Sequence, residues 1–173
     1  HSILFYSGID WFVGKPLYVV DSLKWLSGWL NSFHIYAFTL VSGYLFFYLR
    51  YENGKYQQLK KFLINKIKRL IVPYVFVCII WVVPITCLFF NYTAGDIFKK
   101  YLLATSPSQL WFLWMLFDVF FIVYSMSDVI YKSNVISLII SFVSIIIGAI
   151  GGKLFPNLFC IWTGFSYVAY FIL

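Results

Sequence analysis

The chain has 173 residues, of which 62% are hydrophobic, 24% aromatic and only 11% charged, and its mean hydropathy is +0.87. This composition exposes too much apolar area for a soluble domain of this length, so it predicts a protein of the lipid bilayer. The formal net charge is +7. The basic residues gather at one expected membrane face, a distribution that does not indicate nucleic-acid binding.

We expect an all-α fold, a polytopic transmembrane helix bundle that forms a single domain over residues 1–173. Period-2 alternation is absent, which argues against a barrel. A spanning helix needs roughly 20 apolar residues, and several stretches approach that length. The predicted spans are 1–13 (partial), 28–49, 70–90, 109–131, 134–150 and 158–173 (partial). Because the chain starts without an initiator methionine and stops while still apolar, we interpret it as a fragment truncated at both ends.

Basic residues in the loop after the second predicted span set the expected orientation. Positive residues favour the cytosolic side of short loops. Residues 50–69 carry one acid, Glu52, against Arg50, Lys55, Lys60, Lys61, Lys66, Lys68 and Arg69. We therefore expect this loop in the cytosol and the protein in the cell (inner) membrane as a multi-pass protein.

The same segment has an apolar face. Leu59, Phe62, Leu63, Ile67 and Leu70 recur at helical spacing, which predicts an amphipathic helix lying on the inner membrane surface. One interpretation is topology setting together with attraction to anionic membrane lipids. The other is a docking site for a phosphorylated cofactor, because lysines and an arginine can neutralise phosphates.

Ionisable residues within the apolar spans are candidates for a functional site. Asp118 and His34 lie roughly 14 Å and 9 Å from the outer ends of their predicted spans at 1.5 Å per residue, and His1 belongs to the outer half of the first span. Intramembrane ionisable groups usually face a polar cavity, so the three predict one in the outer half. The alternative for His34 and Asp118 is a local helix-to-helix hydrogen bond.

Other candidate groups have simpler interpretations. Ser42 and Gly43 are small, and small residues commonly allow close approach of membrane helices. The two histidines have no nearby Cys or Glu cluster, so no metal site is expected. No permanently bound cofactor and no oligomeric state are indicated.

Four blocks, taken in order and spacing, resemble the membrane acyltransferase-3 family. They are His1-Ser2; Phe33-His34, Phe38 and Ser42-Gly43-Tyr44-Leu45-Phe46; Phe62, Lys66, Arg69-Leu70 and Pro73-Tyr74; and Gln109-Leu110-Trp111-Phe112-Leu113. Similarity extends over roughly residues 1–116. Members of this family are membrane proteins of about ten helices that move acyl groups, usually acetyl from acetyl-CoA, to hydroxyls of extracytoplasmic sugars and polysaccharides.

The resemblance implies roles for individual residues. His1 corresponds to the family's first-helix histidine and would act as general base or transient acyl carrier. His34 and Asp118, chosen for their depth in the apolar spans, would orient the acceptor or the histidine. Arg69, Lys66 and Tyr74 would hold the acetyl-CoA donor, while Ser42 and Trp111 would contact the saccharide acceptor. For Trp111, an anchor in the interfacial aromatic belt is the alternative.

Two other functions compete with an O-acyltransferase. A transporter or flippase of saccharides or lipid-linked saccharides would also need a polar cavity among aromatic helices. A non-catalytic membrane partner would tolerate changes at His1, His34 and Arg69. The resemblance favours the enzyme because the matching blocks include these charged positions.

Overall fold

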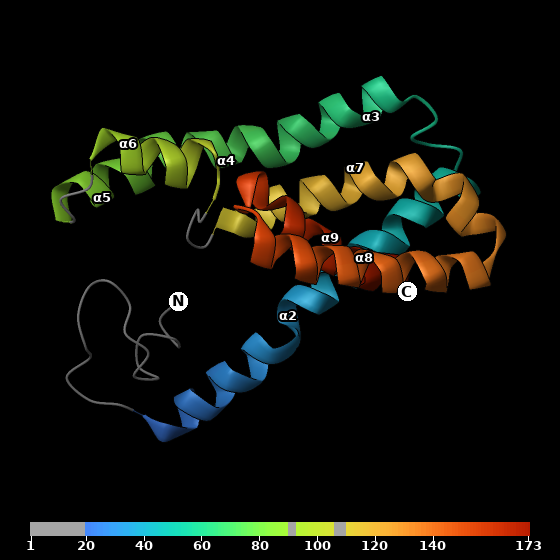
Figure 1. Ribbon diagram of the computed structural model, residues 1–173, viewed down its shortest axis with the longest axis horizontal. Coiled ribbons are helices and arrows are strands. Elements are labelled where there is room, and N and C mark those ends of the chain that lie inside the picture. Colours follow the sequence, from blue (N-terminus) through green and yellow to red (C-terminus); the bar gives the residue numbers. More distant parts are fainter. Residues whose placement is uncertain (1–19, 90–92, 106–109) are drawn as a thin grey trace. The chain divides into compact units, whose positions relative to one another are not determined.

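A computed structural model describes residues 20–89, 93–105 and 110–173 of the chain (Figure 1). Of these described residues 89% are helical and none lies in a strand, which confirms the predicted all-α fold. The chain divides into two compact units, residues 1–38 and 39–173. Each unit is treated by itself below.

Four of the described helices are long and apolar enough to cross a membrane, namely Asp21–Glu52, Leu59–Leu88, Trp111–Lys132 and Asn134–Leu154. A fifth apolar helix, Leu158–Ile172, is shorter. The first two begin well before the predicted starts at residues 28 and 70, and the fourth ends later than the predicted residue 150. Residues 21–27 were placed outside any span, but they are helical here. The predicted amphipathic helix over residues 59–70 is helical as expected and is continuous with the following span. The predicted first span lies outside the described residues.

The 21–52 helix consists of α2 (Asp21–Phe47) and a π-helical turn, Tyr48–Glu52. Its first turn carries Asp21, an acid at the end of the helix where negative charge is favourable. In the first unit, the rings of Trp25 and Trp29 stack with centroids 6.5 Å apart, and Trp29 meets Phe33 edge-on at 4.8 Å. These aromatic contacts run along one side of α2.

Two prolines shape the 59–88 helix without breaking it. A proline inside an α-helix removes a hydrogen bond and clashes with the preceding turn. Pro73 and Pro84 each follow a π-helical turn, in which Val72 N–H bonds to Ile67 O and Val83 N–H bonds to Cys78 O. The wider turn accommodates the proline ring. The segments are α3 (Leu59–Lys66), a π turn (Ile67–Ile71), α4 (Val72–Val77), a π turn (Cys78–Val82) and α5 (Val83–Phe89).

The α3–α4 part of this helix packs lengthwise and antiparallel against α7 (Trp111–Lys132). Phe62 contacts Tyr124 at 4.8 Å, whereas Tyr74, farther along the helix, meets Trp114 at 5.7 Å between ring centroids. The sequence led us to expect this segment on the membrane surface. In the structure the Phe62 face of this segment packs against α7, and Phe62 is 1% exposed.

A short helix, α6 (Ala94–Ile97), and a π turn (Phe98–Leu102) follow. Thr93 donates its backbone N–H and its hydroxyl to the Asp96 carboxylate at 3.2 and 2.6 Å, a capping arrangement at the start of α6. These hydrogen bonds from Thr93 lower the pKa of Asp96. They fix where α6 begins.

Helices α7, α8 (Asn134–Leu154) and α9 (Ile161–Ile172) pack against one another (Figure 1). Small residues on α8 face α9 and are buried: Ser141, Ser144, Gly148 and Gly151. A Cβ atom at Gly148 would lie 2.3 Å from Ser166 Oγ, and one at Gly151 would lie 2.2 Å from the Trp162 ring. Close approach of these helices therefore depends on the absence of side chains.

Gly43 permits the same kind of contact between α2 and α9. A Cβ atom there would lie 1.8 Å from the backbone oxygen of Phe171, which cannot move aside as a side chain could. We expect Gly43→Ala to destabilise the protein by about 1–3 kcal/mol or more, the usual cost of overpacking. Thermal unfolding in detergent measures this.

Gly28→Ala is the matched control, since it lies in the same helix with no atom within 4 Å of an added Cβ. Alanine is favoured over glycine in a helix by about 1 kcal/mol, so this variant should keep or slightly raise the melting temperature. Equal melting temperatures for Gly43→Ala and wild type would contradict the packing described for α2 and α9.

Candidate active site

A cavity of about 590 Å³ lies beside the first half of α7, where the chain turns from α8 into α9. We call it the Trp114–Asp118 pocket. Its lining is aromatic and apolar apart from one carboxylate, and consists of Trp114, Asp118, Phe155, Pro156, Leu158, Phe159, Ile161 and Trp162. The size and composition are those of small-molecule sites, which are about 300–1,000 Å³ and mostly apolar with few polar groups.

Two buried polar atoms of the pocket residues have little or no hydrogen bonding. Within the described part of the chain, Trp114 Nε1 and Asp118 Oδ2 are the buried side-chain atoms of this kind. Trp114 Nε1 faces the oxygen of the Tyr74 hydroxyl, which can accept from it while donating its own proton to Tyr101 O, so Asp118 Oδ2 is the one of the two without a neighbouring partner. Unpaired polar groups in an apolar interior are costly. One is a donor and the other an acceptor, and they lie one helical turn apart on α7.

A strained corner forms the opposite wall of the pocket. Phe159 and Cys160 both adopt left-handed backbone conformations, with φ of 53° and 60°. Such conformations are costly for residues other than glycine and cluster at functional sites. Phe159 N–H donates to Leu103 O at 2.9 Å, and the Cys160 thiol donates to Ala104 O at 3.3 Å. These bonds hold the corner in place.

The predicted catalytic residues are not all brought together. His1 lies outside the described residues. His34 belongs to the first unit, where its Nδ1 lies 2.8 Å from Leu30 O, one turn back in its own helix. Asp118 lies in the second unit, seven residues or roughly 10 Å from the start of α7. Its Cβ lies 3.0 Å from the position that a Cβ on Gly164 would occupy.

Of the predicted donor-binding residues, Lys66 has the most informative surroundings. Its Nζ lies 3.4 Å from the centroid of the Phe120 ring and 5.3 Å from that of Phe62, in cation–π geometry. Arg69 is exposed and close enough to repel it. In the described ranges the salt bridge is between Arg50 and Asp128, so neither Lys66 nor Arg69 has a carboxylate within 4 Å there.

Tyr74, Ser42 and Trp111 lie elsewhere. Tyr74 is buried and its hydroxyl bonds to Tyr101 O, so it joins α4 to the segment after α6. Ser42 is half-buried beside Gly43 on α2. Trp111 contacts Tyr167 of α9, with ring centroids 5.9 Å apart, and is absent from the pocket lining.

The structure shows functional candidates that the sequence reasoning missed. Trp114 could have been found, because it precedes Asp118 by one helical turn. Trp162 and the left-handed corner could not, since only the path of the chain after α8 brings them to α7. No group of three His, Cys, Asp or Glu side chains in the described ranges could hold a metal ion.

An ion pair that the sequence did not predict joins the ends of α2 and α7. Arg50 is 8% exposed, donates to Asp128 Oδ1 at 3.2 Å and lies over the Tyr124 ring at 4.2 Å. Tyr51 donates to the same oxygen at 2.7 Å. The Tyr124 hydroxyl donates to Tyr56 O at 2.9 Å. Arg50, one of the basic loop residues, is thus committed to holding the structure.

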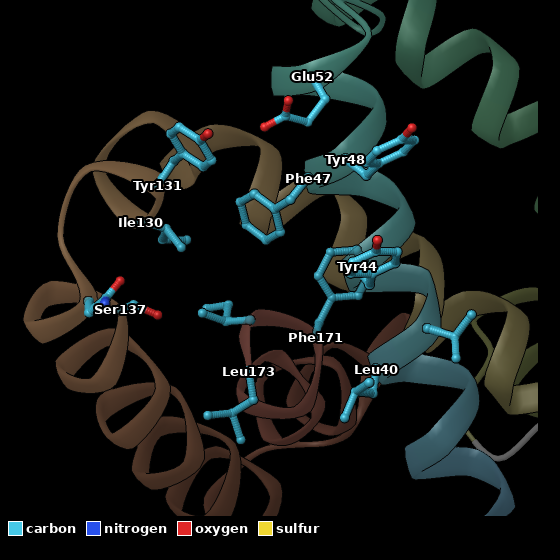
Figure 2. Close-up of a pocket in the computed structure, with 13 residues that line it drawn as sticks. Leu40, Tyr44, Phe47, Tyr48, Glu52, Ile130, Tyr131, Ser137, Phe171 and Leu173 are labelled. Carbon is cyan, nitrogen blue, oxygen red and sulfur yellow. The ribbon is translucent and has the colours of Figure 1, made fainter.

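A second cavity, of about 720 Å³, adjoins this end of the second unit (Figure 2). Figure 2 shows Tyr44 on α2 and Tyr48 on the π-helical turn after it, across from Tyr131, with Glu52 at one edge. The Tyr44 and Tyr48 rings stack at 6.1 Å. None of the residues predicted to act in catalysis or binding lines this cavity.

Helices long and apolar enough to cross a membrane, one of them carrying a half-buried carboxylate, define a membrane protein. The sequence matches the profile of the acyltransferase 3 family, described as an acyltransferase domain, over residues 2–173. The chain belongs to this family, so it is a membrane acyltransferase. No curated protein and no solved structure matches it.

Proposed function

We propose that the protein is a multi-pass O-acyltransferase of the inner membrane that moves acetyl from acetyl-CoA to a hydroxyl of an extracytoplasmic saccharide. Family membership supports acyl transfer. The observation that carries the proposal is a cation held against α7 and a buried carboxylate on the same helix. The Lys66 ammonium of α3 lies over Phe120, and Asp118 lies two residues earlier, about 3 Å along the helix axis but on a different side of α7.

The cation pair suits the donor. Lys66 and Arg69 are neighbouring positive charges, and neither has a carboxylate within 4 Å in the described ranges. Lys66 and Arg69 can make charge-assisted hydrogen bonds to phosphate oxygens of coenzyme A. While no phosphate is bound, the ring of Phe120 holds the Lys66 ammonium in place.

The reaction needs a base for the acceptor hydroxyl. The hydroxyl oxygen attacks the thioester carbonyl carbon, the C–S bond breaks, and the thiolate takes up a proton as coenzyme A leaves. His1 either accepts the hydroxyl proton or carries the acetyl group transiently on a ring nitrogen. Asp118 accepts a hydrogen bond from the acceptor and thereby orients it.

A transport assay beside a transfer assay tests the proposal against the flippase alternative. Full-length protein in vesicles, given acetyl-CoA labelled in the acetyl group and a saccharide acceptor, should release coenzyme A in step with acetylated saccharide. A transporter would move labelled saccharide across the vesicle membrane with no loss of thioester. That result would overturn the proposed function.

A further inference from the structure

The loop between α2 and α3 contains a strained residue, Tyr56. Its φ is 61°, in the left-handed region, where a bulky aromatic residue is rarely found. Such strain persists only where the surrounding structure fixes it, and it clusters at functional sites. We call Tyr56 and its neighbour Gln57 the Tyr56 corner. Its conformation must be held by contacts with other segments.

Two side chains hold the backbone of the Tyr56 corner. The Tyr124 hydroxyl of α7 donates to Tyr56 O at 2.9 Å and lies 3.2 Å from Gln57 O. Arg50 Nη1 donates to Tyr56 O at 3.5 Å, and Gln57 Nε2 donates to Arg50 O at 3.1 Å. Arg50 is itself fixed, because it is 8% exposed, pairs with Asp128 and lies over the Tyr124 ring. The strained carbonyl is therefore held against α7.

The conformation of this corner sets the position of the Tyr56 ring. The ring stacks on Phe46 with centroids 6.2 Å apart and meets Phe62 edge-on at 5.0 Å. Lys66 Nζ lies 5.7 Å from the centroid of Tyr56, 5.3 Å from that of Phe62 and 3.4 Å from that of Phe120. An ammonium is attracted to a ring within about 6 Å of its centroid. The Lys66 ammonium thus lies among three rings.

The Tyr56 corner connects the buried arginine to the lysine of the proposed donor site. We infer that Arg50 and Tyr124 are positioning residues for Lys66. They fix the backbone of Tyr56, whose ring limits where the Lys66 ammonium can move. This inference rests on the proposed function, in which Lys66 meets a phosphate of acetyl-CoA. An ammonium that is already held in place loses less conformational freedom when the phosphate binds, so the corner lowers the KM for the donor.

Tyr124→Phe tests this inference through the loss of one hydroxyl. The variant keeps the ring that packs against Phe62 and Arg50, and it loses the donor to Tyr56 O. The KM for acetyl-CoA should rise about three- to tenfold, the usual effect of one lost neutral hydrogen bond, while kcat stays near the wild-type value. Tyr56→Leu removes the ring and should have a similar effect. Tyr56→Phe keeps the ring and should behave as wild type.

Tyr51→Phe is the matched control, because it also removes one tyrosine hydroxyl from the surroundings of the buried arginine. The Tyr51 hydroxyl donates to Asp128 Oδ1 at 2.7 Å rather than to the Tyr56 corner, so its loss should leave the donor KM unchanged. Combining Tyr124→Phe with Lys66→Met should give the donor KM of Lys66→Met alone, because the hydroxyl acts through that ammonium. A general loss of stability would instead add to the effect of Lys66→Met.

The position of the ammonium can also be followed without acetyl-CoA. Full-length protein in nanodiscs is treated briefly with an amine-reactive N-hydroxysuccinimide ester, and mass spectrometry compares the labelling of half-buried Lys66 with that of exposed Lys61. An amine among three rings is shielded from the reagent. Tyr124→Phe and Tyr56→Leu should therefore raise the relative labelling of Lys66 by about threefold or more. Tyr51→Phe should leave it unchanged.

Unchanged labelling of Lys66 in a folded Tyr124→Phe variant would overturn the inference. An equal rise in donor KM for Tyr51→Phe, or additive effects in the double variant, would do the same. Failure of the proposed function looks different: the labelling of Lys66 would respond to the corner variants while Lys66→Met keeps the wild-type KM for acetyl-CoA. Melting temperatures show whether each variant is folded.

Discussion

Replacing His1 by alanine in the full-length protein is expected to lower kcat for acetyl transfer by about 10²–10⁴-fold, the usual contribution of a general base. Without the His1 side chain no base accepts the proton of the acceptor hydroxyl, so the hydroxyl must attack the thioester while still protonated. The KM values for donor and acceptor should change little, because in this proposal neither the cation pair nor the Trp114–Asp118 pocket includes His1. Steady-state transfer of labelled acetyl measures all three constants.

Two further measurements separate the roles that are open to His1. If it acts only as a base, added imidazole should restore part of the activity of His1→Ala. If it carries the acetyl group, wild type incubated with labelled acetyl-CoA and no acceptor should retain label on the protein, and the variant should not. Acetylation by a folded His1→Ala variant at near wild-type rate would remove the histidine from the mechanism.

Composition and hydrophobic periodicity were sufficient to predict the fold class. The all-α prediction holds, and the predicted spans at 109–131 and 134–150 lie close to Trp111–Lys132 and Asn134–Leu154. The continuity of the helix from Leu59 to Leu88 was missed because the basic segment was interpreted as a separate helix on the membrane surface. Two π-helical turns accommodate Pro73 and Pro84, and their backbone hydrogen bonds leave no signal in the residue pattern.

The candidate site was predictable only one residue at a time. Asp118 was found because a carboxylate in an apolar span is conspicuous. Its surroundings were not, since Phe159 and Trp162 reach α7 through a left-handed corner held by bonds to the segment before α7. Trp111 was chosen over Trp114 because it falls in the matching sequence block. Both tryptophans lie on the same face of α7 as Asp118, and only Trp114 lines the pocket beside it.

The packing of α3 along α7 also changes the expected path of the acyl group. From the sequence we expected Arg69 at an inner mouth, far from the outer groups. Lys66 instead lies over Phe120, near the middle of α7, and the helix continues past Arg69 to Tyr74 beside Trp114. Lys66 thus lies within about one helical turn of Asp118 along α7, although the two groups lie on different sides of that helix.

If the donor is bound at this depth, Lys66→Met should raise the KM for acetyl-CoA by about tenfold or more while leaving the acceptor KM unchanged. Losing a charge-assisted hydrogen bond costs about 1.5–3 kcal/mol, and 1.4 kcal/mol corresponds to tenfold. Methionine keeps the apolar contact with Phe120, so the protein should still fold. Lys61→Met is the control, since Lys61 is exposed on the same helix and its substitution removes the same charge. A higher KM for acetyl-CoA in Lys66→Met alone would locate the donor phosphates beside Phe120. Equal KM values for acetyl-CoA in the two variants would mean that the segment attracts acetyl-CoA only through its overall charge.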